Sequence, residues 1–209
     1  AVVNGIAYPS NVNYQYGFMS GVNYAKAKYD AKAEYVEIPS YAGTDVTNKN
    51  VGGNYIGNFS DEATGKVVGK ALLDQGVDIM LVAAGGSGNG VFTAVKEAGD
   101  AQVIGCDVDQ YDDGANGDKN IILTSVLKVM HSNVEKQLEK VLDGSFKGEN
   151  ALLGADTDST GYVSADGRQQ LSAETLEKLA DVYKKVQSGE IVPAANFNNM
   201  TPDNFTGLK

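Results

Sequence analysis

The most constraining feature of this sequence is an uninterrupted apolar run, VDIMLVAA (residues 77–84). It is followed by the glycine-rich stretch GGSG (85–88) and by a helix-type pattern, GVFTAVKEAG (90–99). An apolar run without alternation is typical of a parallel strand that helices cover on both faces. The chain must therefore supply further strands beside this run and helices above and below it.

Strand-type and helix-type segments alternate along the first part of the chain. The pattern predicts strands at residues 1–8, 33–39, 54–59, 77–84, 101–109 and 121–127. It predicts helices at residues 11–29, 60–76 (from Ser60 as N-cap to Gly76 as C-cap) and 90–99, with a turn-rich loop at 44–53 and an acidic loop at 110–120. Such alternation predicts an α/β fold with a parallel sheet flanked by helices and right-handed crossovers.

The pattern changes after Leu127. Residues 128–144 form an amphipathic helix pattern that ends at Gly144, with an apolar stripe of Val129, Val134, Leu138 and Val141. A polar, strand-like stretch (149–164) leads to a second helix pattern with Ser172 as N-cap, and residues 196–209 are predicted to be an irregular tail.

The net charge of the chain argues against two classes of partner, and the lengths of its apolar runs argue against a membrane-spanning helix. A formal net charge of -10 and a pI near 4.5 argue against nucleic acid and anionic membranes, which bind clustered Lys and Arg. No segment reaches the ~18 apolar residues of a membrane helix. The single cysteine, Cys106, excludes an intrachain disulfide, and its apolar surroundings predict a buried structural thiol.

The glycine stretch fits neither common phosphate-binding pattern. Val91 and Phe92 stand where a Walker loop needs Lys and Ser or Thr, and Val91 also stands where the dinucleotide fingerprint needs its third glycine. What remains is exposed backbone N–H at a helix start, suited to a polar ligand. The alternative is that the glycines only permit a tight turn and close packing.

Two carboxylates, Asp107 and Asp109, follow the strand at 101–109. Strand alternation predicts that they face the same way, where they could bind a divalent metal or two ligand hydroxyls. A metal there would suit an enzyme that transfers groups to or from a nucleotide sugar. The later acids Asp112, Asp113 and Asp118 depart from the calcium-loop pattern and are predicted to be solvated.

Several segments together resemble one known family. AAGGSGNGVFTAVKEAG, IGCDVDQ and ILTSVLK, with GFMSGVNYA, GNFSDEATGK and VQSGEIVP in the same order, resemble the basic membrane protein family of substrate-binding lipoproteins. Its better understood members bind purine nucleosides for ABC importers. The resemblance implies a type I periplasmic-binding-protein fold, no enzymatic activity and no cofactor.

The resemblance also implies a domain organisation. Residues 1–123 match the family's second α/β lobe, 124–150 a hinge crossing and a helix that returns toward the first lobe, and 151–209 a C-terminal strand, helix and tail. Most of the first lobe is expected to be absent, so the helix at 129–142 should expose an apolar stripe or pair with another chain, for instance in a homodimer.

The family's pattern places one set of residues beside the ligand. Phe59 would stack on a base; the alternative is that Phe59 is a core residue. Asp107 would accept hydrogen bonds from the ribose hydroxyls, and Lys128 would be a hydrogen-bond donor that faces the cleft. The full set is Phe59, Gly85, Gly86, Ser87, Gly88, Phe92, Asp107 and Lys128, with Asn11 and Tyr14 as weaker candidates and no metal ligand.

The expected partners are a nucleoside, in particular a purine nucleoside, and an ABC transporter permease. The expected location is extracytoplasmic, with a lipid anchor upstream of Ala1. A sugar or a signalling molecule is the alternative ligand, because one fold serves many ligands.

Overall fold

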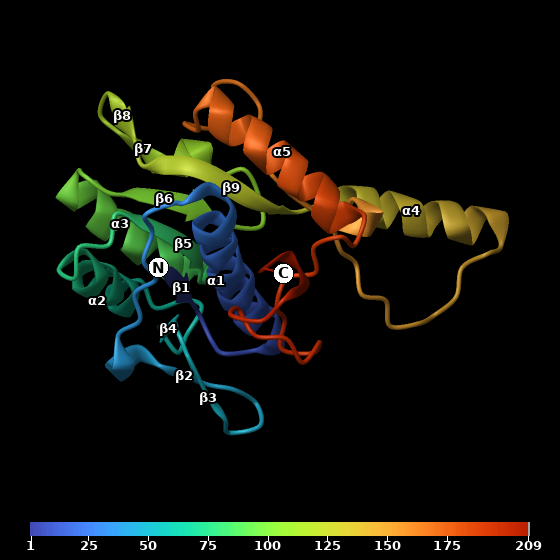
Figure 1. Cartoon of the computed structure of the whole chain (residues 1–209), viewed down its shortest axis with the longest axis horizontal. Coiled ribbons are helices and arrows are strands. Elements are labelled where there is room, and N and C mark those ends of the chain that lie inside the picture. The colour runs from blue at the N-terminus through green and yellow to red at the C-terminus, as the bar shows by residue number, and fades with distance from the viewer. Residues whose placement is uncertain (209) are drawn as a thin grey trace.

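The computed structural model describes residues 1–208 and is built around a six-stranded sheet in the order β10-β9-β6-β5-β1-β4 (Figure 1). All neighbouring strands are parallel except β9 and β10, which are antiparallel. The strands are β1 (Val2–Asn4), β4 (Asn54–Tyr55), β5 (Ile79–Ala83), β6 (Gln102–Gly105), β9 (Ile122–Lys128) and β10 (Thr160–Tyr162). The predicted α/β fold with a mostly parallel sheet is confirmed.

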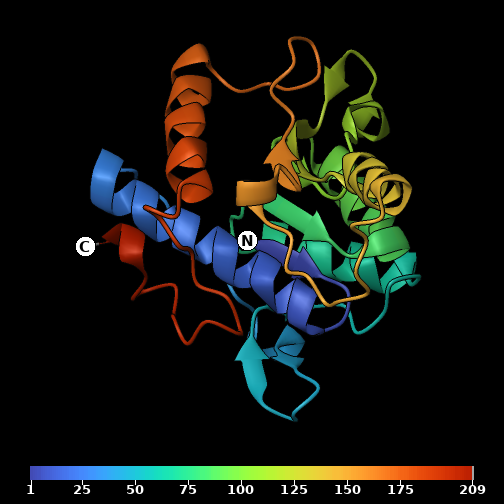
Figure 2. The same cartoon turned by 90° about the vertical axis from the view of Figure 1, so that its right-hand side faces the viewer.

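Helices cover both faces of this sheet, α1 on one side and the pair α2 and α3 on the other (Figures 1 and 2). Two further helices, α4 and α5, follow the last parallel strand. The helices are α1 (Pro9–Tyr29), α2 (Glu62–Leu73), α3 (Gly88–Ala98), α4 (Met130–Asp143) and α5 (Ala173–Gln187). None of the helices within residues 1–208 is both long and apolar enough to cross a membrane.

The main core lies between the sheet and the helix pair α2 and α3. Leu72, Met80, Val91 and Ile122 are among its fully buried side chains. The helices approach closely at Gly90, where a Cβ atom would collide with the backbone of Glu62. Close packing is therefore one reason for a glycine in this helix.

The prediction of a strand at residues 33–39 is wrong. The residues before the short helix η1 (Pro39–Tyr41) lie beside β4, but they form no ladder with it. Instead the side chain of Asn54 accepts from Ile38 N at 2.9 Å and donates to Val36 O at 3.1 Å. One buried amide thus replaces the backbone bonds that would have defined a strand.

The two predicted loops contain short hairpins. The turn-rich loop holds β2 (Gly43–Thr44) and β3 (Asn50–Gly52), and the acidic loop holds η3 (Tyr111–Gly114), β7 (Ala115–Asn116) and β8 (Lys119–Asn120). In the polar stretch, η4 (Ala155–Thr157) precedes β10, and η5 (Thr206–Leu208) lies in the tail.

The predicted N-cap of α2 is off by one residue. Asp61, not Ser60, caps the helix, and its carboxylate accepts from the backbone N of Thr64 at 2.9 Å and from its hydroxyl at 2.7 Å. The helix ends at Leu73, before the predicted Gly76, whose φ of 81° closes the following turn. The Ser172 cap of α5 and the Gly144 end of α4 are as predicted.

The helix α4 exposes three of the four residues of the predicted apolar stripe, whereas the fourth, Val129, precedes the helix and is partly buried. The helix has no buried residue, and Val134, Leu138, Val141 and Leu142 are more than half exposed. In Figure 1 this helix extends away from the sheet, so no other part of the described chain covers its stripe.

Candidate functional site

The order of the parallel strands determines where a ligand pocket forms. Counted along the chain, the five parallel strands lie in the order 2-1-3-4-5, which reverses direction between β1 and β5. In open α/β sheets, ligands bind at the carboxyl ends of the strands beside such a reversal. The chain leaves β1 and β5 at this edge through the start of α1 and through the glycine stretch.

A pocket of about 540 Å³ lies at this edge. This is within the usual range of roughly 300–1,000 Å³ for small-molecule sites. Seven of the eight predicted site residues line it, namely Phe59, Gly85, Gly86, Gly88, Phe92, Asp107 and Lys128, and so do Asn11 and Tyr14. The structure thus brings together residues from five separate segments of the sequence.

Glycine in the pocket wall is explained by a tight turn and by close packing, and the same stretch exposes backbone N–H groups at a helix start. Gly85 has a φ of 54°, and a Cβ atom at Gly85 or Gly86 would lie 3.1 or 3.2 Å from the carbonyl oxygen of Phe59. The stretch Gly85–Ser87 forms a short helix, η2, that runs into α3. The first N–H groups of a helix have no partner within it, so they are suited to a polar ligand.

Ser87, the eighth predicted residue, does not line the pocket. Its side chain is fully buried, and its hydroxyl donates to Asn58 O at 3.0 Å and accepts from Asp61 N at 2.8 Å. Its own N–H donates to Phe59 O at 3.1 Å. Ser87 therefore ties the glycine stretch to the loop that carries Phe59.

Phe59 is a partly buried ring at the pocket wall, not a core residue. It lies against the backbone of Gly5, where a Cβ atom would collide with the ring, and its centroid is 6.1 Å from that of the half-exposed Tyr8. Phe92, only 5% exposed, contributes to the pocket from within the core. In addition to the ring of Tyr14, the pocket thus offers the ring of Phe59 to a flat ligand.

Asp107 is the central polar group of the pocket. One of its carboxylate oxygens accepts from the Tyr14 hydroxyl at 3.1 Å and lies 3.2 Å from the Lys128 ammonium. The backbone O of Asp107 also accepts from Lys128 N at 2.9 Å. Burial raises the pKa of Tyr14, with smaller contributions from Cys106 and Asp107, so the phenol remains a donor at neutral pH.

Two features of Asp107 are typical of a ligand-binding residue: its side chain is only weakly paired, and its backbone is strained. Its side chain is 45% exposed and that of Lys128 is 53% exposed, and ion pairs this exposed contribute only about 0–1 kcal/mol. The backbone φ of Asp107 is 70°, a left-handed conformation that costs an L-residue roughly 1 kcal/mol. Strain of this kind is found at ligand sites, where the surroundings hold a residue in place.

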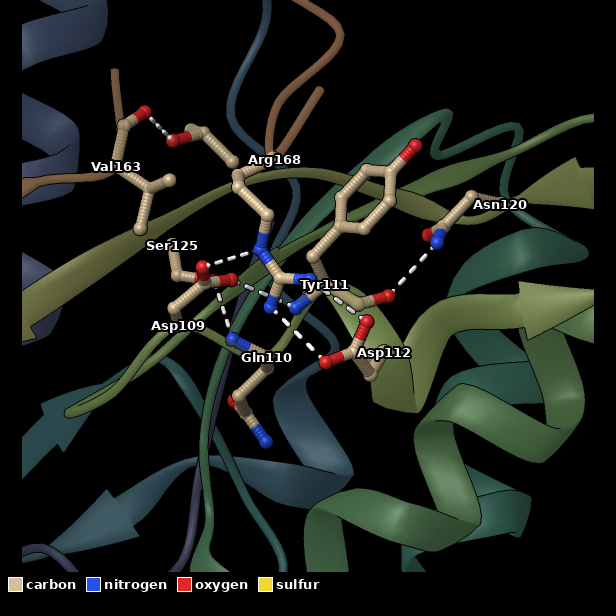
Figure 3. Close-up of polar contacts among 9 residues, drawn as sticks. Asp109, Gln110, Tyr111, Asp112, Asn120, Ser125, Val163 and Arg168 are labelled. Carbon is tan, nitrogen blue, oxygen red and sulfur yellow. Dashed lines mark hydrogen bonds and ion pairs between the residues drawn. The ribbon is translucent and has the colours of Figure 1, made fainter. Parts of the chain in front are cut away.

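The prediction that Asp109 faces the same way as Asp107 is wrong. The strand β6 ends at Gly105, so strand alternation does not extend to these two residues. Asp109 instead accepts from Arg168 Nε at 2.7 Å (Figure 3). Within residues 1–208 no group of three or more His, Cys, Asp and Glu side chains could hold a metal ion. The residues therefore do not fit the metal site considered from the sequence.

The other predicted acids are largely exposed, as expected. Asp112 is nevertheless paired with Arg168, and Asp113 accepts from Gln110 Nε2 at 3.2 Å.

Sequence reasoning missed eight further residues that line the pocket, among them Asn89, Cys106 and Gln110. Cys106 is only partly buried and lines the pocket, in contrast to the predicted buried thiol, although burial still raises its pKa to about 11. The side-chain oxygen of Gln110 accepts from Cys106 N at 2.8 Å. No sequence signal distinguishes Gln110, because its role depends on the path of the loop.

Asn11 is less available than its position suggests. Its side chain is 7% exposed, and its amide donates to Ala83 O at 2.9 Å. It therefore fastens the start of α1 to the end of β5, whereas Tyr14, one turn later, reaches Asp107.

Comparison with known proteins gives one family. A family model described as "ABC transporter substrate-binding protein PnrA-like" matches residues 41–196. Basic membrane protein D of Borreliella burgdorferi (strain JD1) is 31% identical over 97% of this chain, which spans 53% of that relative. A protein of Lactococcus lactis subsp. cremoris (strain MG1363), named ABC transporter nucleoside-binding protein BmpA, is 37% identical over 45% of this chain and 30% of its own length.

The fold is also found among solved structures. An ABC transporter solute-binding protein from Aeropyrum pernix K1 matches 95% of this chain and 58% of its own, with a TM-score of 0.71 and 22% identity. The descriptions of the family model, of the Lactococcus lactis protein and of the Aeropyrum pernix structure name binding proteins, not enzymes. The chain spans about half the length of the curated relatives that match nearly all of it.

Proposed function

The chain belongs to the family of PnrA-like ABC transporter substrate-binding proteins, and on this premise we propose that its pocket binds a purine nucleoside. The observation that carries the proposal is the placement of Asp107, with Tyr14 and Lys128 beside it, in the same pocket as the accessible ring of Phe59. A nucleoside presents a flat base and vicinal hydroxyls, which these groups complement.

The charge of the pocket favours a neutral ligand. Asp107 and Lys128 are the two charged residues that line it, and they pair with each other. A nucleotide would add at least one negative charge with no unpaired cation in the lining to balance it. A nucleoside would hydrogen-bond to the pocket without adding a net charge to it.

Each candidate residue has a distinct role in this proposal. The carboxylate of Asp107 accepts from ribose hydroxyls, and Lys128 donates to the same part of the ligand. Phe59 stacks on the base, and the N–H groups of the glycine stretch bond its polar edge. Stacking on an aromatic side chain contributes about 1–3 kcal/mol per base.

The proposal extends to the role of the whole protein. In this proposal the whole protein serves an ABC importer outside the cytoplasm and delivers its ligand to a permease. A lipid anchor holds the protein at the membrane. Residues 1–123 act as one lobe of a clamp, 124–150 as the connection to a second lobe and 151–209 as the closing C-terminal segment. The apolar stripe of α4 is covered by that second lobe or by another copy of the chain.

Isothermal titration with guanosine, adenosine and inosine tests the ligand class. It is run on this chain and on a version extended to the length of its relatives, which we expect to bind more tightly because a second lobe would exclude water. Asp107→Asn should weaken binding roughly 10- to 100-fold, as expected for one hydrogen bond to a charged group. Phe59→Ala should weaken it by a similar factor.

Asp118→Asn serves as the matched control, because Asp118 is an exposed carboxylate on the acidic loop and outside the pocket. We expect its affinity to equal that of the wild type. If no purine nucleoside binds either length of the protein, the ligand class is wrong, and sugars and other neutral solutes are the next to titrate.

A further inference from the structure

Arg168 connects two parts of the chain that are far apart in the sequence. It ends a turn after β10, where its N–H donates to Ala165 O at 3.1 Å. This segment runs beside β9, because Val163 N donates to Ser125 O at 2.9 Å and Gln170 N donates to Leu123 O at 2.8 Å. From there the guanidinium reaches across to the loop that follows β6 (Figure 3).

The guanidinium makes three contacts with this loop. Its Nε donates to Asp109 at 2.7 Å, and its two terminal nitrogens donate to both carboxylate oxygens of Asp112 at 2.7 and 3.1 Å. Its carbon Cζ also lies 5.3 Å from the centre of the Tyr111 ring. An isolated surface ion pair is weak, but two-point binding within a network is the exception.

The loop held in this way begins at Asp107. Between Asp107 and Asp112 the backbone turns sharply, with Val108 N donating to Cys106 O and Tyr111 N donating to the carboxylate of Asp109. Gln110 N donates to Ser125 Oγ at 3.1 Å, which fixes the middle of the loop to β9. Arg168 holds Asp109 and Asp112, neither of which lines the pocket.

We propose that Arg168 is a positioning residue that keeps the carboxylate of Asp107 at the pocket. The left-handed backbone conformation of Asp107 is less favourable than an extended one, so contacts that hold the loop also help to keep this residue in place. Removing Arg168 frees Asp109 and Asp112, which then repel each other, and the loop relaxes toward conformations that move Asp107. The effect on ligand affinity rests on the proposed function, but the effect on the loop does not.

The loop itself is tested without a ligand, through the alkylation rate of Cys106 by iodoacetamide. Cys106 is the single cysteine of the chain, it precedes Asp107 directly, and burial raises the pKa of its thiol. Arg168→Gln should raise its rate by roughly tenfold, because the loop opens more often. Lys66→Gln, which removes an ion pair of 2.6 Å to Glu97 on another part of the surface, should leave the rate unchanged.

A double-mutant cycle in nucleoside affinity then separates positioning from general stability. Arg168→Gln should weaken binding roughly tenfold in the wild type and less than about twofold in the Asp107→Asn background, because the group it positions is already lost. An equal loss in both backgrounds would show that Arg168 acts only on overall stability and would overturn the proposal.

A second variant keeps the test decisive if Arg168→Gln fails to fold. Asp112→Asn leaves the arginine in place and removes its two-point partner, so it should raise the alkylation rate by a smaller factor. An unchanged rate in a folded variant of either kind would contradict the proposal. If wild-type protein binds no nucleoside but the rates rise as described, the positioning role holds and the proposed ligand class fails.

Discussion

The helix pair α2 and α3 and the later helix α4 have similar apolar patterns in the sequence but different surroundings in the structure. The apolar face of α2 and α3 is buried against the sheet, with Leu72 and Val91 both 0% exposed. The apolar stripe of α4 is open, with Leu138 57% exposed. Periodicity therefore identifies which face of a helix is apolar, but it does not tell whether the same chain covers that face.

The largest expected effect comes from a matched pair of leucine truncations. Leu72→Ala should lower the free energy of unfolding by about 2–5 kcal/mol, because it leaves a cavity in the core. Leu138→Ala should change it by less than about 0.5 kcal/mol, because the side chain is already in contact with solvent. Urea unfolding of both variants measures the difference. If both variants lost the same free energy of unfolding, the apolar stripe of α4 would have to be packed against another surface, contrary to this account.

The next effect is a loss of stability at alkaline pH, to which Cys106 in the pocket contributes. Burial raises the pKa of Cys106 from 9.0 to about 11, so its contribution to stability is present below pH 9.0 and is lost as the pH rises toward about 11. The urea midpoint should fall between pH 8.5 and pH 10.5, and part of that fall should be absent in Cys106→Ala. An identical fall in both proteins would contradict this assignment.

A third and smaller effect separates the helix caps of α2 and α5. Asp61→Ala removes a cap from a helix in the core and should lower global stability by about 1–2 kcal/mol. Ser172→Ala removes a cap from α5, which has no buried residue, so the main change should be faster amide hydrogen exchange within α5. A large shift of the urea midpoint for Ser172→Ala would show that α5 unfolds together with the core.

The smallest change in folding free energy is expected for Leu138→Glu, which makes the α4 stripe polar. The variant should unfold like the wild type but should self-associate less at high concentration, since exposed apolar patches drive association. Sedimentation velocity of both proteins is the measurement. A wild type that stays monomeric at every concentration would show that the stripe alone does not bring two copies together.

The same contrast explains how much of the fold the sequence predicts. The central strand at 77–84 and its neighbours were predictable, because strands covered on both faces have no polar alternation. The expected strand at 33–39 failed because a single side chain, Asn54, takes the place of the ladder. Propensity cannot anticipate a contact that depends on where a distant residue lies.

The candidate site was predictable to a similar extent and for a similar reason. Strand ends meet at one edge of a parallel sheet, so Gly85 and Asp107 could be placed together from the pattern and the family resemblance. The direction of Asp109 could not, because β6 ends early and the loop turns toward Arg168. The burial of Ser87 likewise follows from loops that have no periodic pattern.

The central claim is that Asp107 recognises the ribose of a nucleoside in this pocket. The most direct test is to measure the affinities of inosine and dideoxyinosine for the wild type and for Asp107→Asn, in the version of the protein that has the length of its relatives. The account predicts that the wild type prefers inosine by roughly tenfold or more and that Asp107→Asn loses most of this preference. A preference that survives Asp107→Asn unchanged would contradict the claim.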